Sequence, residues 1–202
     1  MYTKLSRYIS YLLRHHPEDL ELTMDNNGWV NCNELVNKIH KTGKYIINID
    51  ILKQIVKEDD KQRYSFSSDG KCIRANQGHS IKDVDLQLNP VKPPDILLHG
   101  TNETNVKLIF GSGCISSMSR QYVHLSEDVI TAFTVGSRHG GAPVALFIDC
   151  KKMYKDGYLF YKSENNVWLT NKIDLKYVID IGFVDDEGQI ISAKKVNEDK
   201  CK

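Results

Sequence analysis

A proline-rich stretch near the middle of the chain most limits what this sequence can form. Pro90, Pro93 and Pro94 fall within LNPVKPP, where they favour an extended backbone and remove amide donors that a helix or sheet would use. We therefore predict a linker over residues 88–95, between a first lobe over 1–87 and a second over 96–202. With 202 residues, of which 41% are hydrophobic, the chain is long enough to form real cores.

The first lobe shows helical periodicity followed by a hairpin pattern. Apolar residues recur at helical spacing in LSRYISYLLRHH, CNELVNKIHK and IDILKQIVK, and a short extended segment, NGWVN, separates the first two. RYSF and KCIRA flank SSDG, which predicts two strands joined by a tight turn. The order helix, strand, helix, helix and hairpin is typical of a winged-helix module, which often binds nucleic acid.

The second lobe is richer in short β-type runs. These runs are ILLHG, YVHLS, VALFID, YLFY, VWLT and VIDIGFV, and helical segments are expected near residues 103–110 and 127–135. The chain is therefore predicted to be of the α+β class. The sequence has neither GxGxxG nor GxxxxGK followed by Ser or Thr, so a nucleotide would be bound without a Rossmann or P-loop cradle.

Charge and cysteine usage argue against several classes of protein. The 27 Lys and Arg residues against 26 Asp and Glu give a net charge of only +1, so recognition of an anion must depend on local clusters. The five cysteines are dispersed, without CxxC or histidines at metal-ligand spacing, which argues against a metal site and a disulfide framework. No apolar run approaches 18 residues. We expect a cytoplasmic, monomeric protein without a membrane segment or metal.

Cationic residues in three short motifs are suited to phosphate chemistry. Arg14 and His15 lie in LLRHHPE, Arg63 in DKQRYSF and Arg120 in SMSRQYVHLS. Guanidinium groups keep their charge and donate paired hydrogen bonds to phosphate oxygens, whereas histidine exchanges a proton near neutral pH. In its helix Arg14 falls opposite the apolar arc, so we expect its side chain to face solvent or a ligand. Together these residues predict a phosphate site to which both lobes contribute.

Five motifs in order carry a resemblance to a known family. LSRYISYLLRHHPE, KQRYSFSSDGKCIRANQGHSI, LLHGT, MSRQYVHLS and NNVWLT resemble the RNA 2′-phosphotransferase family, and the resemblance covers about residues 5–184. It implies an N-terminal winged-helix lobe that binds RNA and a C-terminal lobe with the ADP-ribosyltransferase fold. It also implies that Arg14, His15, Arg63 and Arg120 form the catalytic set.

The resemblance implies a reaction in which NAD is a co-substrate. An internal RNA 2′-phosphate, of the kind left at a tRNA splice junction, attacks the nicotinamide-bearing ribose carbon of NAD and releases nicotinamide. The ribose 2″-hydroxyl of the resulting RNA-2′-phospho-ADP-ribose then attacks the phosphorus. The products are RNA with a 2′-hydroxyl and ADP-ribose 1″,2″-cyclic phosphate. We assign His15 a dual role, as phosphate ligand and as general acid for the departing 2′-oxygen, and the sequence alone does not separate the two.

The resemblance also leads to an NAD pocket and a set of RNA contacts. The predicted cofactor-binding residues are His99, Gly100, Thr101, His124, Ser126, Arg138 and Val167. Gly100 is expected to let a ligand approach the backbone closely. The predicted RNA contacts are Arg74, Asn76, Gln77, His79 and Ser119. Val167 stands where many ADP-ribosyltransferases carry a glutamate, and Glu164 is a reserve candidate for that carboxylate.

Two other functions stay open. An ADP-ribosyltransferase that performs only the first step would modify another acceptor, such as a phosphate end of nucleic acid or a protein. A non-enzymatic alternative is a winged-helix protein whose second lobe senses NAD. The products distinguish the three functions, because the phosphotransferase yields a cyclic phosphate and a 2′-hydroxyl, the first alternative yields a stable ADP-ribosyl adduct, and the second shows no turnover.

Overall fold

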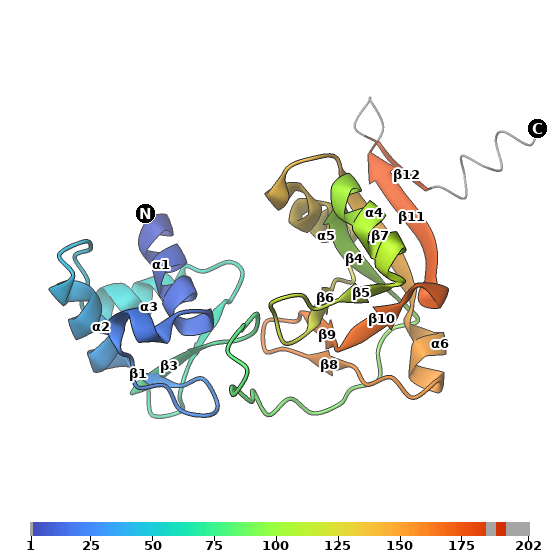
Figure 1. Cartoon of the computed structure of the whole chain (residues 1–202). Coiled ribbons are helices and arrows are strands. Elements are labelled where there is room, and N and C mark those ends of the chain that lie inside the picture. Colours follow the sequence, from blue (N-terminus) through green and yellow to red (C-terminus); the bar gives the residue numbers. More distant parts are fainter. Residues whose placement is uncertain (1, 185–188, 193–202) are drawn as a thin grey trace, which may run out of the picture. The chain divides into compact units, whose positions relative to one another are not determined.

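The computed structural model describes residues 2–184 and 189–192, which form a mixed α/β structure with several antiparallel sheets (Figure 1). Two compact units share the chain. Unit 1 consists of Met1–Leu88, Ser119–Gln121 and Ser163–Asn166, and unit 2 of Asn89–Met118, Tyr122–Lys162 and the chain from Val167 onward. The chain first passes from unit 1 to unit 2 after Leu88, within the proline-rich stretch. Residues 185–188 and 193–202, including Cys201, belong to the predicted second lobe and lie outside the described residues.

Unit 1 follows the order of helix, strand, helix, helix and hairpin that the sequence predicts. Its elements are α1 (Thr3–Arg14), the 3-10 helix η1 (Pro17–Leu20), β1 (Val30–Asn31), α2 (Cys32–Lys41), α3 (Ile49–Lys57), β2 (Tyr64–Phe66) and β3 (Cys72–Ala75). The strands form one antiparallel sheet in the order β1, β3, β2, in which Tyr64 pairs with Ala75. The predicted helices and hairpin are confirmed.

Asparagine side chains determine where two of these helices begin. The side-chain oxygen of Asn31 accepts hydrogen bonds from the amides of Asn33 and Glu34, at 2.9 and 3.2 Å. The side-chain oxygen of Asn48 accepts one from the amide of Ile51 at 2.8 Å. Each cap satisfies amides that the first turn of a helix leaves without a partner, so α2 and α3 start directly after an asparagine.

The core of unit 1 fixes the rotation of α1 about its axis. Its apolar stripe consists of Leu5, Ile9, Leu12 and Leu13, none more than 4% exposed, and packs in one cluster with residues of α2, α3 and β3. Burying each Leu or Ile side chain stabilises the fold by roughly 1.5–3 kcal/mol. Because Leu12 and Leu13 are both fully buried, the next residue, Arg14, is held at the edge of this core.

Unit 2 is built around a four-stranded antiparallel sheet in the order β12, β11, β7, β4. These strands are β4 (Ile96–Asn102), β7 (Pro143–Asp149), β11 (Val178–Val184) and β12 (Ile190–Ser192). A second sheet has the order β6 (Val123–Leu125), β9 (Trp168–Thr170), β8 (Tyr161–Lys162), and β5 (Cys114–Ser116) pairs with β10 (Lys172–Asp174). The helices are α4 (Glu103–Ser112), α5 (Val129–Gly136), α6 (Cys150–Lys155) and the 3-10 helices η2 (Ser137–His139) and η3 (Leu175–Tyr177).

The six β-type runs predicted in the second half each contribute to a strand, and both predicted helices are present. The run YLFY contributes only its last residue, because the carbonyl of Phe160 instead accepts a hydrogen bond from the amide of Val91. Sequence patterns did not predict β5, β10, β12 and α6. The missed strands have three residues each, too few to show alternation, and α6 follows β7 directly, where Asp149 caps the amide of Lys152. No helix within the described ranges is long and apolar enough to cross a membrane.

Two glycines let α5 lie directly on β4. A Cβ atom on Gly100 would be 2.0 Å from the carbonyl oxygen of Ala132 in α5, and one on Gly136 would be 2.1 Å from the carbonyl oxygen of Thr101. Cβ atoms do not approach other atoms this closely, so packing alone requires glycine at both positions. The α5 backbone fills the space beside the Gly100 α-carbon, so packing accounts for glycine at this position, and the role of Gly100 beside NAD stays a prediction.

We predict that Gly100→Ala lowers the free energy of unfolding by about 1–3 kcal/mol, because α5 must move away from β4. Gly111→Ala is the matched control, since the added methyl group meets no atom within 4 Å outside its own helix and alanine favours a helix by about 0.5–1 kcal/mol. Denaturant unfolding of both variants measures the difference. Equal stability of the two variants would contradict the packing argument.

Candidate active site

Arg14 is the most enclosed of the predicted catalytic side chains. Its Nε and Nη2 atoms are buried and have no hydrogen-bond partner among the described residues. Burial, with smaller contributions from Arg63 and Arg120, lowers the pKa of Arg14 to about 10, which still leaves it charged at pH 7. A buried cation beside two further cations is unfavourable unless an anion joins it. The surroundings of Arg14 therefore favour an anion-binding site.

His15 follows Arg14 at the C-terminal end of α1 and is held by Ser80. Its Nδ1 atom lies 3.0 Å from the hydroxyl oxygen of Ser80, and the amide of Ser80 donates a 3.0 Å hydrogen bond to the carbonyl of Arg14. Burial first, and then the charges of Arg14 and Arg120, lower the pKa of His15 below its usual range. Because Nδ1 is engaged by Ser80, Nε2 is the ring nitrogen left to bind a ligand.

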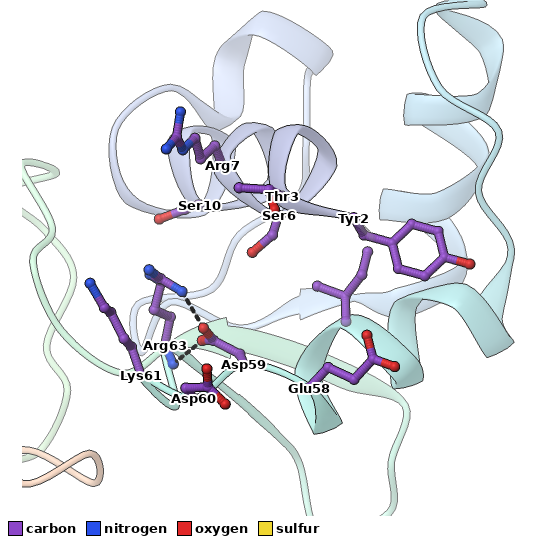
Figure 2. A pocket seen from close by; sticks show the side chains of 11 residues that line it. Tyr2, Thr3, Ser6, Arg7, Ser10, Glu58, Asp59, Asp60, Lys61 and Arg63 are labelled. Atoms are coloured by element: carbon purple, nitrogen blue, oxygen red, sulfur yellow. Dashed lines mark hydrogen bonds and ion pairs between the residues drawn. The ribbon is translucent and has the colours of Figure 1, made fainter.

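Arg63 is anchored by an aspartate one helical turn earlier in the chain. The amide of Arg63 donates a 2.5 Å hydrogen bond to Asp59, and its guanidinium Nη1 atom forms an ion pair with the same carboxylate (Figure 2). The Asp59 side chain is only 4% exposed, whereas that of Arg63 is 32% exposed. The ion pair thus holds one edge of the guanidinium in a fixed position, and the remaining nitrogens can bind an anion.

Arg120 joins unit 1 although it comes from the second half of the chain. The next residue, Gln121, anchors this segment. Its amide donates to the carbonyl of His79 at 3.1 Å, and its Nε2 atom donates to the carbonyls of Ile81 and Val84 at 2.9 and 2.6 Å. Arg120 is exposed and its charge lowers the pKa values of Arg14 and His15. The four predicted catalytic residues therefore all belong to unit 1.

Two of the predicted RNA contacts are buried beside these residues. Asn76 is 5% exposed, and it donates from its side chain to the carbonyl of Gln62 at 2.7 Å and from its amide to the carbonyl of Arg63 at 2.8 Å. His79 is 1% exposed, and neither of its ring nitrogens has a partner among the described residues. The hydrogen bonds of Asn76 tie its loop to Gln62 and Arg63, and both buried side chains lie away from solvent. Gln77 is half-buried and Ser119 is exposed.

Arg74 is engaged by an acidic and an aromatic partner. Its guanidinium lies 4.5 Å from the ring centroid of Trp29 and pairs with Glu164 at 2.7 Å. Glu164 also accepts a hydrogen bond from Ser65. Burial raises the pKa of the Glu164 carboxyl, but the hydrogen bonds from Ser65 and Arg74 outweigh burial and lower it overall. A carboxylate held in this way is a poor general base, so the geometry does not favour Glu164 as the reserve catalytic carboxylate.

In unit 2, β4 and β6 bring several of the predicted NAD-binding residues together. His99 Nδ1 lies 3.1 Å from the carbonyl oxygen of His124, and Leu98 and Ser126 exchange two backbone hydrogen bonds of 2.8 and 2.9 Å. The hydroxyl of Ser126 bonds to the backbone of Asp128 at the start of α5.

The other predicted cofactor residues of unit 2 differ in exposure. Thr101 is buried at 6% exposure, and Val167 is half-buried directly before β9. Arg138 is exposed in η2 and forms no hydrogen bond or ion pair within the described part of the chain. The structure therefore groups His99, His124 and Ser126, and it does not show Arg138 bound to that group.

Comparison with known proteins decides the family. Residues 2–172 match the family described as RNA 2′-phosphotransferase, Tpt1 / KptA family. The chain belongs to this family. It is 50% identical over 175 residues to a protein of Fusobacterium nucleatum named "Probable RNA 2′-phosphotransferase". The aligned region covers 87% of this chain and 96% of that protein. Proteins of the same name in Acaryochloris marina and Nostoc punctiforme are 45% and 46% identical, covering 88% and 87% of this chain and 96% and 94% of theirs.

Three residues outside the predicted set of site residues help to build the site of this RNA 2′-phosphotransferase family member. Asp59 anchors Arg63, Ser80 holds His15, and Gln121 ties the Arg120 segment to the backbone. Asp59 and Arg63 lie beyond the end of α3, so helical spacing does not predict their ion pair. Ser80 belongs to the polar ANQGHS segment, but no pattern pairs it with His15 or pairs Gln121 with its carbonyls, since these partners lie far away in the sequence.

The buried His79 predicts a pH-dependent stability. Burial first, and then the charge of Arg14, lower its pKa from 6.5 to about 4. The unfolded chain therefore binds the proton more readily, and the contribution of His79 to stability is complete above pH 6.5 and is lost as the pH falls towards 4. The linked change amounts to about 3 kcal/mol.

We expect His79→Gln to show a shallower decrease in the free energy of unfolding between pH 6.5 and 4 than the unmodified protein. His40→Gln, at an exposed position in α2, is the control and should retain the full slope. Urea unfolding across this pH range gives the slopes. Identical slopes for all three proteins would show that the His79 ring is not held neutral by the fold.

Proposed function

We propose that this protein is an NAD-dependent RNA 2′-phosphotransferase, which removes an internal 2′-phosphate from RNA, such as that of a tRNA splice junction, by transfer to NAD. Family membership supports the transfer of an RNA 2′-phosphate. The observation that carries the proposal is the buried Arg14 guanidinium with two nitrogens that have no partner among the described residues, next to His15, Arg63 and Arg120. Such a cluster matches a doubly charged phosphate monoester better than a phosphodiester with one charge.

The three arginines act first by holding the phosphate as a nucleophile. Their guanidinium groups keep their charge and donate paired hydrogen bonds to two phosphate oxygens, which leaves the third oxygen to attack the ribose carbon that carries nicotinamide. The new C–O bond forms as the bond to nicotinamide breaks, and nicotinamide leaves with the electron pair. No general base is needed because the nucleophile is already an anion. This agrees with Val167 in place of a glutamate and with the engagement of Glu164 by Arg74.

In the second step the arginines stabilise charge on the phosphoryl oxygens. The ribose 2″-hydroxyl attacks the phosphorus and releases its proton to solvent, and the bond to the RNA 2′-oxygen breaks as that oxygen takes a proton from His15. Donors already in position for these oxygens lower the barrier without further rearrangement. Arg63 suits this role because Asp59 fixes its guanidinium.

His15 supplies the proton that the departing RNA 2′-oxygen needs. Ser80 engages Nδ1, so Nε2 is directed to substrate chemistry. Burial first, and then the charges of Arg14 and Arg120, lower the pKa of His15 in the free protein. A bound phosphate dianion offsets the effect of those two charges, so substrate binding favours the protonated form that a general acid requires.

The predicted winged-helix and ADP-ribosyltransferase architectures complete the proposal. In unit 1 the order of elements fits a winged helix. In unit 2 the adjacent His99, His124 and Ser126 would bind NAD together with the buried Thr101, two residues after His99 in β4. A monomer that binds RNA and NAD in the cytoplasm, without a metal, is the simplest form of this enzyme.

The direct test is incubation of the purified protein with NAD and a short oligonucleotide carrying one internal 2′-phosphate, followed by mass analysis. We expect RNA with a 2′-hydroxyl, ADP-ribose 1″,2″-cyclic phosphate and nicotinamide. A stable ADP-ribosylated RNA would instead identify an enzyme that performs only the first step. No consumption of NAD would rule out both enzymes.

We predict that Arg120→Ala lowers the rate of 2′-phosphate release by a factor of about 100 to 1,000, by analogy with the loss of one donor to a developing oxyanion. Arg120 is exposed, so the variant should fold and bind NAD as before. Lys44→Ala removes an exposed cation of the same unit and should leave the rate unchanged. Single-turnover release of the cyclic phosphate measures all three proteins. Near-normal turnover of Arg120→Ala would refute the assignment of the catalytic set.

A further inference from the structure

A pocket of about 350 Å³ adjoins Arg63 in unit 1 (Figure 2). One wall comes from Tyr2 and the start of α1, with Ser6, Arg7 and Ser10. The other comes from the end of α3 and the segment that follows it, with residues 55, 58–61 and 63. The volume falls in the range of small-molecule pockets, roughly 300–1,000 Å³. Arg63 belongs both to this pocket and to the proposed phosphate site, so a ligand in the pocket would lie next to the phosphate.

The cations that line this pocket gather at one end. Figure 2 shows Arg7, Lys61 and Arg63 towards that end, with Asp59 and Asp60 beside Arg63, and Tyr2 and Glu58 towards the other. Arg7 is exposed and forms no ion pair or hydrogen bond within the described part of the chain, so its charge is available to an anion. The Asp59 carboxylate is already engaged by Arg63 and does not oppose an anion at the cationic end.

Tyr2 gives the opposite end an aromatic surface. Its ring is half-buried and packs against the core cluster of unit 1, which holds it in place. Aromatic side chains of this kind stack with the bases of single-stranded nucleic acid, whatever the base. The Glu58 carboxylate nearby is an acceptor for amino groups or ribose hydroxyls.

We propose that this pocket binds one nucleotide flanking the 2′-phosphorylated residue of an RNA strand. Its phosphodiester lies between Arg7 and Lys61, and its base stacks on Tyr2. This inference rests on the proposed function, because it takes Arg63 to be a ligand of the 2′-phosphate. It assigns to the protein a preference for phosphates inside a strand over the same phosphate on an isolated nucleotide.

The test compares two substrates that share the same 2′-phosphate. One is a single 2′-phosphorylated nucleotide with methyl-capped 5′ and 3′ phosphates, and the other a hexanucleotide with the phosphate at its centre. Affinities are measured without NAD, by calorimetry for the short ligand and fluorescence anisotropy for the long one. Release of the 2′-phosphate is measured separately with NAD present.

We expect Arg7→Gln to weaken binding of the hexanucleotide about five- to tenfold more than binding of the single nucleotide, and to reduce the salt dependence of hexanucleotide binding by about one phosphate contact. Tyr2→Ala should cost about fivefold or more on the hexanucleotide. The 5′ and the 3′ neighbour of the phosphorylated nucleotide are then made abasic in turn. The loss of affinity caused by Tyr2→Ala should disappear for only one of these two ligands, and that ligand identifies which neighbour occupies the pocket. Lys4→Gln is the matched control, an exposed cation of α1 that does not line the pocket.

The outcomes separate this inference from the proposed function. If the unmodified protein releases the 2′-phosphate but Arg7→Gln and Tyr2→Ala affect both substrates equally, or no more than Lys4→Gln does, the flanking subsite is refuted and the function stands. If no substrate loses its phosphate yet the hexanucleotide still needs Arg7 and Tyr2, the function fails and the RNA subsite stands.

Discussion

The burial of the Arg14 guanidinium is the constraint on which the candidate site depends. The apolar stripe of α1 places Leu12 and Leu13 in the core of unit 1, and Arg14 follows them at its edge with two nitrogens that have no partner in the described chain. Moving a cation out of water is unfavourable, and the nearby Arg63 and Arg120 increase the cost. Burial of the surrounding leucines offsets this free-energy cost. The fold thus holds positive charge in place before an anion binds. In the proposed reaction that anion is the RNA 2′-phosphate, and such preorganised charge would lower a barrier with charge on the phosphoryl oxygens.

The cations around Arg14 differ in how they are held. Arg63 is paired with the nearly buried Asp59, and Arg74 is paired with Glu164 and covers the ring of Trp29. These partners fix the positions of two guanidinium groups, although each also lowers the positive charge that a ligand meets. Arg14 keeps its full charge, and the Ser80 contact orients His15 beside it. The site therefore combines anchored cations, which give geometry, with one enclosed cation, which gives binding strength.

Local patterns predicted most of the secondary structure but not the burial around the site. Asn31 and Asn48 cap α2 and α3, and such caps involve only the next three residues. The family resemblance implied RNA contacts for Asn76, Gln77 and His79 of ANQGHS. Asn76 and His79 are instead buried, since backbone hydrogen bonds tie this segment to the carbonyls of Arg63 and Arg14. The packing role of Gly100 was not predictable from local patterns either, because the α5 carbonyl beside it comes from a distant part of the sequence.

By itself the sequence determined which residues are available and which face of α1 is apolar, because helical periodicity is a property of neighbouring residues. It also carried the motifs that mark the family. Only the tertiary structure decided that Arg120 joins Arg14, His15 and Arg63 in one unit. That grouping depends on hydrogen bonds from Gln121 to the backbone carbonyls of a loop far along the chain, and such contacts leave no periodic trace in the sequence.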